Sequence, residues 1–262
     1  MGKITSALKK VAEERIERME KITRIRENTQ LVIKKMTNSN VDASIVAYFD
    51  PKALITEQYK ILRTNILSLN KGNKPLKSFV VTSSIHSEGK TVTSLNLAFC
   101  MAQTVRKPKV LLIDADLRKG RMARYLGVQQ RTGLTEVLLG EAQLEDVLFH
   151  IDYDNLTFMS CGKVPDNPAE LLSSERFKQL LVEVEDKFDY ILIDTPPIIP
   201  VTDSGIVGAQ VDGVLMVIQA GRTQRGIIKR AEELLHQAQS KVIGHVLTNI
   251  EYHLPEYIYR YL

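Results

Sequence analysis

The chain lacks tryptophan altogether and has only two cysteines among its 262 residues. Cys100 and Cys161 are far apart and form no Cys-x-x-Cys pair, which excludes a disulfide scaffold and a cysteine-rich zinc site. No apolar run approaches the roughly 18 residues that a bilayer-spanning helix needs, and the N-terminus has no apolar stretch typical of a signal peptide. We therefore expect a cytoplasmic protein with reduced thiols and one large core.

The surplus of basic residues is concentrated in the N-terminal segment. Residues 1–36 hold ten Lys or Arg and five Glu, while the rest of the chain is close to neutral. Residues 3–36 contain no Gly or Pro, and apolar residues recur every three or four positions between charged ones, which predicts an amphipathic helix. Such a helix can dock on its own domain, on a second copy, on a membrane surface or on a partner protein. The pattern leaves these four alternatives open.

The rest of the chain shows an alternation typical of an α/β fold. The polar residues 37–40 predict a linker and residues 53–69 a helix, and from residue 78 short apolar runs alternate with helical stretches. This alternation predicts a mostly parallel sheet flanked by helices. We expect an N-terminal extension over 1–50, one α/β domain over 51–251 and a tail over 252–262. The predicted strands lie at 78–83, 110–113, 190–193, 214–218 and 242–243.

A phosphate-binding pattern lies between the first predicted strand and the helix that follows it. Residues 84–91 read Ser-Ile-His-Ser-Glu-Gly-Lys-Thr and match G-x-x-x-x-G-K-[ST], with Ser84 in place of the first glycine. Backbone N–H groups at a helix N-terminus can face phosphates, Lys90 can reach the β- and γ-phosphates, and the Thr91 hydroxyl can ligate Mg²⁺. The predicted nucleotide contacts are Ser84, Ile85, His86, Ser87, Glu88, Gly89, Lys90, Thr91 and Val92. Asn249, after the last predicted strand, is a candidate contact to the adenine ring.

Carboxylates follow two further predicted strands. Asp114 and Asp116 come after the strand at 110–113, and Asp194 comes after the strand at 190–193. The carboxyl ends of parallel strands meet at one edge of a sheet, so these side chains should converge on the phosphate loop. Mg²⁺ prefers hard oxygen ligands, and a carboxylate near the γ-phosphate can accept a proton from an incoming hydroxyl. We therefore predict that Mg²⁺ is coordinated by Thr91, by one or two of Asp114, Asp116 and Asp194, and by the nucleotide phosphates.

These three motifs resemble those of the bacterial tyrosine kinases. The phosphate loop resembles their Walker A motif, Val110-Leu-Leu-Ile-Asp-Ala-Asp-Leu-Arg118 their Walker A′ motif, and Ile191-Leu-Ile-Asp-Thr-Pro-Pro197 their Walker B motif. The stretch from Gly162 to Leu172 resembles the family's G-x-x-P-P-N-P-x-E-L-L, and Val201-Thr-Asp203 also matches. The resemblance covers residues 53–262 and implies a P-loop NTPase fold, Mg-ATP as the cofactor, and catalytic roles for Lys90, Asp114 and Asp116, with Asp114 as the base toward a tyrosine hydroxyl.

The resemblance also implies self-association through the first predicted helix of the domain. The family's E-x-x-R-x-x-R motif appears here as Glu57, Lys60 and Arg63, with Lys60 in place of the first arginine. A lysine keeps the charge but loses the planar, bidentate fork of arginine. We expect a homo-oligomer, with a ring as one possible form, whose contacts are weaker or differently arranged than the motif alone implies.

Tyrosines cluster at the C-terminus. Four of the nine tyrosines, Tyr252, Tyr257, Tyr259 and Tyr261, fall within the last eleven residues. A terminal cluster is hard to explain by core packing, and it suits an autokinase that modifies neighbouring copies. A strand or an interface patch is the structural alternative.

Two other functions remain open from the sequence. A partitioning or cell-division ATPase of the same fold would carry a signature lysine where this chain has Ile85. A catalytically weak nucleotide-binding regulator of polysaccharide export is the other alternative. The resemblance implies a role in exopolysaccharide synthesis, a separate transmembrane activator of the polysaccharide co-polymerase type, recruitment to the inner face of the plasma membrane and a tyrosine phosphatase, with no nucleic-acid partner.

Overall fold

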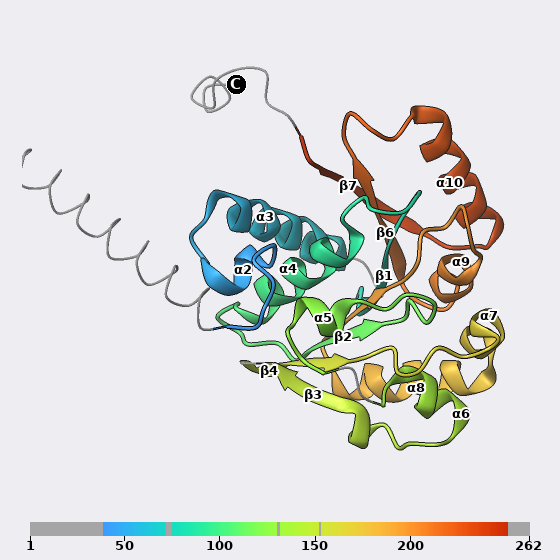
Figure 1. Ribbon diagram of the computed structural model, residues 1–262. Coiled ribbons are helices and arrows are strands. Elements are labelled where there is room, and N and C mark those ends of the chain that lie inside the picture. The colour runs from blue at the N-terminus through green and yellow to red at the C-terminus, as the bar shows by residue number, and fades with distance from the viewer. Residues whose placement is uncertain (1–38, 72–74, 130–131, 152, 251–262) are drawn as a thin grey trace, which may run out of the picture.

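The computed structural model describes residues 39–71, 75–129, 132–151 and 153–250. Across these ranges a seven-stranded sheet runs in the order β3-β4-β2-β5-β1-β6-β7 (Figure 1). The strands are β1 Ser78–Ser83, β2 Val110–Asp114, β3 Leu148–Ile151, β4 Tyr153–Met159, β5 Tyr190–Asp194, β6 Gly213–Gln219 and β7 Val242–Thr248. All neighbouring pairs in it are parallel except β3 with β4. The predicted α/β fold is confirmed, and two strands, β4 and the antiparallel edge strand β3, are additions to the five predicted ones.

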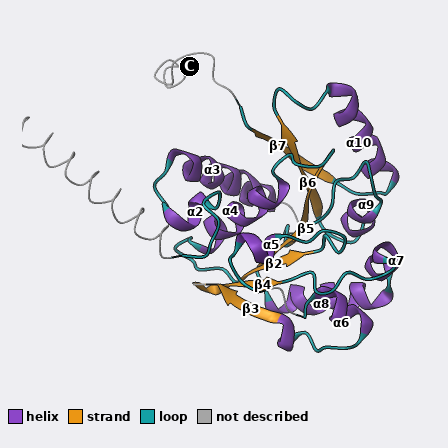
Figure 2. Cartoon of the chain, viewed as in Figure 1, coloured by secondary structure: helices purple, strands orange, loops and turns teal. Residues whose placement is uncertain are grey.

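Helices cover both faces of the sheet (Figure 2). They are α2 Val46–Phe49, α3 Leu54–Ser68, α4 Lys90–Ala102, α5 Met122–Tyr125, α6 Leu134–Leu139, α7 Pro168–Ser173, α8 Glu175–Lys187, α9 Asp203–Gly208 and α10 Arg225–Gln237, with 3₁₀ turns at Leu69–Lys71 and Glu145–Val147. The strand residues explain the two layers, because Phe79 and Val81 of β1 pack toward α2, α3 and α4 while Val80 packs toward α8, α9 and α10. Both faces of the central strands are therefore buried.

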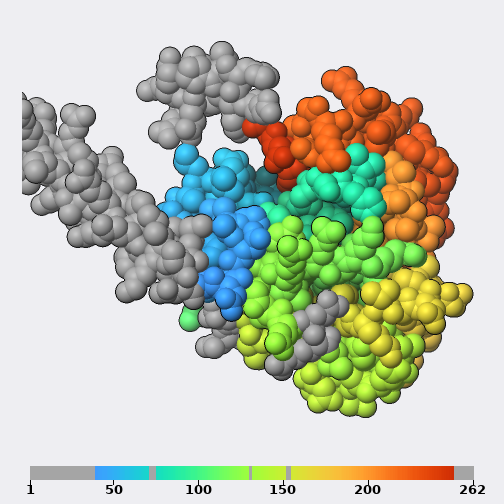
Figure 3. All heavy atoms as spheres, in the orientation of Figure 1, coloured from blue at the N-terminus to red at the C-terminus, as the bar shows by residue number. Residues whose placement is uncertain are grey.

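The segment before residue 51 is part of this core. Ile45 and Ala47 are fully buried, and the ring of Tyr48 lies 5.4 Å from that of Phe99 on α4. The Asn96 side chain of α4 bonds the segment twice, accepting from Ala47 N at 2.9 Å and donating to the Ser44 carbonyl at 3.0 Å. Figure 3 shows this segment in blue against the neighbouring helices. The folded domain thus begins earlier than the sequence boundary at residue 51.

Two of the predicted segments lie outside the described residues. They are the amphipathic helix over 3–36 and the tail with Tyr252, Tyr257, Tyr259 and Tyr261. Within the ranges that the structure describes, no helix is both long and apolar enough to cross a membrane.

Candidate nucleotide and phosphoryl-transfer site

The phosphate loop joins β1 to α4 at the carboxyl edge of the sheet. Gly89 caps α4 in the left-handed region at φ 91°, and Ser87 also has a positive φ of 64°. Glycine adopts this conformation freely, whereas a serine there carries backbone strain. The loop thus keeps a phosphate-loop conformation even where serine replaces a smaller residue.

The Glu88 side chain holds the loop in place from behind. Its carboxylate is almost fully buried and accepts from Ile85 N at 2.8 Å, from Gln219 N at 3.2 Å, and from the Thr223 hydroxyl. The Glu88 carbonyl also accepts from the Thr248 hydroxyl at the end of β7, at 2.8 Å. Glu88 is one of the predicted nucleotide contacts, but its side chain faces the loop after β6 and does not line the cavity.

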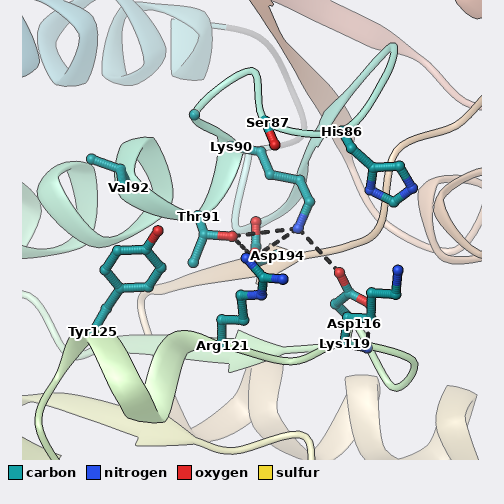
Figure 4. Close-up of a pocket in the computed structure, with 11 residues that line it drawn as sticks. His86, Ser87, Lys90, Thr91, Val92, Asp116, Lys119, Arg121, Tyr125 and Asp194 are labelled. Atoms are coloured by element: carbon teal, nitrogen blue, oxygen red, sulfur yellow. Dashed lines mark hydrogen bonds and ion pairs between the residues drawn. The ribbon is translucent and has the colours of Figure 1, made fainter.

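The residues with reactive side chains meet where α4 begins (Figure 4). Lys90 Nζ lies 3.3 Å from a carboxylate oxygen of Asp116 and 3.3 Å from one of Asp194. The Thr91 hydroxyl donates to Asp194 Oδ2 at 2.7 Å. Burial disfavours the charge of Lys90, but Asp194, Asp116 and Asp114 outweigh that effect and raise the pKa of Lys90. The lysine is therefore a fixed cation at the helix start.

Asp114 is buried beside the cavity and does not line it. It is 2% exposed, and its two oxygens accept from Asp116 N at 3.2 Å and Met122 N at 3.1 Å. Burial, with the nearby charge of Asp194, raises the pKa of Asp114 to about 7. Burial also raises the pKa of Asp194, against the opposing effects of Lys90 and the Thr91 hydroxyl. Asp114 thus holds the loop after β2 and has a proton affinity in the range of a general base.

The donor set suits Mg²⁺. Among the described residues, no three His, Cys, Asp or Glu side chains form a group that could hold a metal ion by themselves. Mg²⁺ does not require one, because it keeps several waters and takes one or two carboxylates together with substrate phosphates. The Thr91 hydroxyl beside Asp194 offers two hard oxygen donors of this kind at the phosphate loop. The fit requires a phosphate-bearing ligand to complete it.

The cavity at this edge has a volume of about 390 Å³. Three lining residues that the sequence did not predict come from the β2–α5 loop and from α5: Lys119, Arg121 and Tyr125. The motif after β2 ends at Arg118. The only sequence signal for these three residues is that they follow this motif directly. The other lining residues are His86, Ser87, Gly89, Lys90, Thr91, Val92, Asp116 and Asp194. Asn249 is exposed directly after β7, and its contact with the base stays a prediction.

The three predicted assembly residues lie on α3 but do not share one environment. Arg63 turns inward and donates to the Cys100 carbonyl of α4 at 2.7 Å. Lys60 Nζ lies 2.7 Å from Glu57 Oε1 and also bonds the Pro51 carbonyl at 2.6 Å. Within a single chain, Arg63 therefore ties α3 to α4, while Glu57 and Lys60 form an ion pair closer to solvent.

Comparison with known proteins places the chain in a family. Residues 86–243 match the family model described as an AAA domain. Tyrosine-protein kinase YwqD of Bacillus subtilis (strain 168) is 37% identical over 83% of this chain and 90% of its own length. Tyrosine-protein kinase CpsD of Streptococcus agalactiae is 39% identical over 74% of this chain and 84% of its own.

A solved structure gives the same result. The kinase domain of the Escherichia coli tyrosine kinase ETK superposes with a TM-score of 0.72 at 31% identity, covering 80% of this chain and 83% of that one. The AAA-domain match implies nucleotide binding with a divalent metal in general. By this match, these relatives and the geometry of the site, the chain belongs to the bacterial tyrosine-protein kinases.

Proposed function

We propose that the chain is an ATP- and Mg²⁺-dependent tyrosine autokinase. Its acceptors are Tyr252, Tyr257, Tyr259 and Tyr261 of neighbouring copies, and its activity regulates exopolysaccharide synthesis and export. The main support for the proposal is the position of Lys90 between Asp116 and Asp194. The Thr91 hydroxyl donates to the Asp194 carboxylate. A triphosphate with its metal supplies the charges that this cluster is built to receive.

The chain's own residues divide the work of the transfer. The loop amides and Lys90 bind the phosphates, and Thr91 and Asp194 would hold a Mg²⁺ ion, which would neutralise phosphate charge. Asp116 is the carboxylate on the cavity wall after β2, where it orients the incoming tyrosine. Asp114 is the proposed acceptor of the phenolic proton, and because it is almost fully buried, the acceptor hydroxyl has to come close to the β2–α5 loop for the transfer.

The test of the nucleotide site is Lys90→Met in the full chain. We expect loss of phosphotyrosine formed with Mg-ATP and a large loss of ATP affinity, with the circular dichroism spectrum unchanged. Lys178→Met is the matched control, because Lys178 forms an exposed pair with Glu175 on α8. Wild-type activity of the Lys90 variant would exclude this site as the kinase centre.

The assignment of the base is tested by two variants that keep side-chain size. Asp114→Asn should reduce the transfer rate far more than the ATP affinity, since a proton acceptor acts mainly in the transition state. Asp116→Asn should weaken both the rate and the response to Mg²⁺. If Asp114→Asn transferred phosphate normally while Asp116→Asn did not, the base would be Asp116.

Assembly and location are further parts of the proposal. We propose a homo-oligomer with contacts through α3, recruitment to the inner face of the plasma membrane by a separate transmembrane activator, and reversal by a tyrosine phosphatase. Exposed apolar side chains on α3, Leu54, Ile55 and Ile61, support a contact through this helix. Light scattering of Glu57→Lys should show smaller species than the wild type, and an unchanged mass would exclude this contact.

A further inference from the structure

We propose that Arg121 is a catalytic residue that binds the terminal phosphoryl group of ATP within its own chain. The inference rests on the proposed function, because it assigns a residue to the same transfer. Arg121 lies outside the three sequence motifs, and it lines the cavity together with Lys90, Thr91 and Asp194. Its side chain extends from the β2–α5 loop toward Thr91 and Asp194 (Figure 4).

The backbone on both sides of Arg121 is fixed to the end of the sheet. A Cβ at Gly120 would lie 2.3 Å from Cys161 Sγ and 2.9 Å from Asp114 Oδ2, so the loop packs there at a distance that only glycine permits. On the other side, Met122 N donates to Asp114 Oδ2 at 3.1 Å. Arg121 therefore projects from an anchored backbone, and a ligand that enters the cavity has to order only its side chain.

The Arg121 guanidinium has no partner in the described part of the chain, whereas the cations of Arg118 and Lys90 are both paired. Arg118 binds Asp203 through two hydrogen bonds, and Lys90 lies between two carboxylates. The Arg121 carbonyl accepts from Tyr125 N at 3.1 Å within α5, and no hydrogen bond or ion pair between described residues involves its guanidinium. An arginine held next to carboxylates without pairing to them remains available for an anion, and its planar fork matches a phosphoryl group.

The chemistry of the transfer creates the charge that such an arginine stabilises. The bond between the γ-phosphorus and the bridging oxygen breaks, leaving ADP with the electron pair. A bond forms to the tyrosine oxygen, whose proton passes to Asp114. During this exchange negative charge spreads over the equatorial γ-phosphoryl oxygens and the bridging oxygen, and a preorganised cation there lowers the barrier. Lys90 and Arg121 would approach this charge from the phosphate loop and from the opposite wall.

The test separates transition-state charge from ordinary nucleotide binding. We would measure, by calorimetry on the full chain, the affinity for Mg-ADP alone and for Mg-ADP with aluminium fluoride, which mimics the transferring phosphoryl group. Arg121→Ala should weaken the aluminium fluoride complex by roughly 100-fold and change the ADP affinity less than about threefold. Arg121→Lys should give an intermediate loss, because the charge stays while the fork is lost.

Arg124→Ala is the matched control. Arg124 lies three positions further along on α5, is exposed and does not line the cavity. It should leave both affinities and the transfer rate at wild-type values. A thermal melt of each variant checks folding, and Arg121→Lys decides the question if Arg121→Ala fails to fold.

Three results would overturn the inference. An equal loss for ADP and for the aluminium fluoride complex would make Arg121 an ordinary nucleotide contact. Unchanged nucleotide affinities with lost phosphorylation of an inactive acceptor chain would assign Arg121 to the acceptor tyrosine. No effect on either would leave it without a role. Failure of the proposed function is distinct, since it would appear as an unaffected Lys90→Met variant or as wild-type protein that binds no Mg-ADP.

Discussion

The Arg118 guanidinium forms a bidentate ion pair with the Asp203 carboxylate, with Nε 2.8 Å from Oδ2 and Nη2 3.0 Å from Oδ1. Asp203 begins α9 and is fully buried, whereas the Arg118 side chain is partly exposed. The pair connects the loop that carries Asp116 to the segment that follows Asp194. It therefore fixes the spacing of two carboxylates that face the phosphate site.

Arg118→Ala should lower the free energy of unfolding by about 2–4 kcal/mol, since it leaves a buried carboxylate unpaired. The transfer rate should fall as well, because the two loops lose their connection. Urea unfolding and single-turnover kinetics measure the two effects. Arg230→Ala is the control, because its pair with Glu233 is exposed and should contribute less than about 0.5 kcal/mol. Equal costs for the two variants would contradict a positioning role for the Arg118 pair.

Glu88→Gln should weaken Mg-ATP binding by roughly tenfold while leaving the fold intact. The carboxylate accepts hydrogen bonds from two backbone N–H groups and a hydroxyl, and an amide nitrogen would face one of these donors without an acceptor. The phosphate loop should then lose its fixed shape. Glu183→Gln on α8, whose carboxylate is about half exposed, is the control. Unchanged ATP affinity in the Glu88 variant would show that the loop holds its shape without this carboxylate.

Compared with deletion of residues 1–38, deletion of residues 1–50 should lower the melting temperature strongly. The longer deletion removes the buried side chains of Ile45, Tyr48 and Phe49, together with the backbone groups of Ser44 and Ala47 that bond to Asn96. Losing several buried apolar side chains costs more than about 5 kcal/mol. Differential scanning fluorimetry measures both deletions, and similar melting curves would place residues 39–50 outside the core.

The sequence motifs predict which residues meet at the site, but not how the side chains around them are oriented. The prediction that Lys90, Asp116 and Asp194 lie close together is confirmed. It follows from their places beside strand ends, because parallel strands align their carboxyl ends at one edge of the sheet. The direction of the Glu88 side chain could not be predicted, since it depends on Gln219 and Thr223, far away in the sequence. A motif states which residue types are present but not which way each one faces.

The sequence does not show that residues 39–50 belong to the core, for a related reason. Their helix, α2, is four residues long and too short to show a hydrophobic period. What holds the segment is a side chain of α4, Asn96, together with the packing of Tyr48 on Phe99. Arg121 could not be predicted from the sequence either, because a single arginine in a loop belongs to no sequence motif. Its position in the cavity is what indicates a role.

Both cysteines should resist alkylation in the native protein. Burial raises the pKa of Cys100 to about 11, and burial with the nearby Asp114 carboxylate raises that of Cys161 to about 12. The thiolate is the reactive form, so at pH 8 each should react at least about 100-fold more slowly than a free cysteine, with the rate rising as the pH approaches the raised pKa. Iodoacetamide labelling followed by mass spectrometry, with and without urea, checks this. Rapid labelling without urea would contradict the buried placement.

The central claim is that this site phosphorylates the tail of another copy. The direct measurement mixes a full chain carrying Lys90→Met with an active chain that lacks residues 252–262, in Mg-ATP, and maps phosphotyrosine by mass spectrometry. The account predicts phosphate on Tyr252, Tyr257, Tyr259 or Tyr261 of the inactive chain, and none when the truncated partner also carries Lys90→Met. An unmodified tail on the inactive chain, beside wild-type protein that does phosphorylate itself, would contradict transfer between copies.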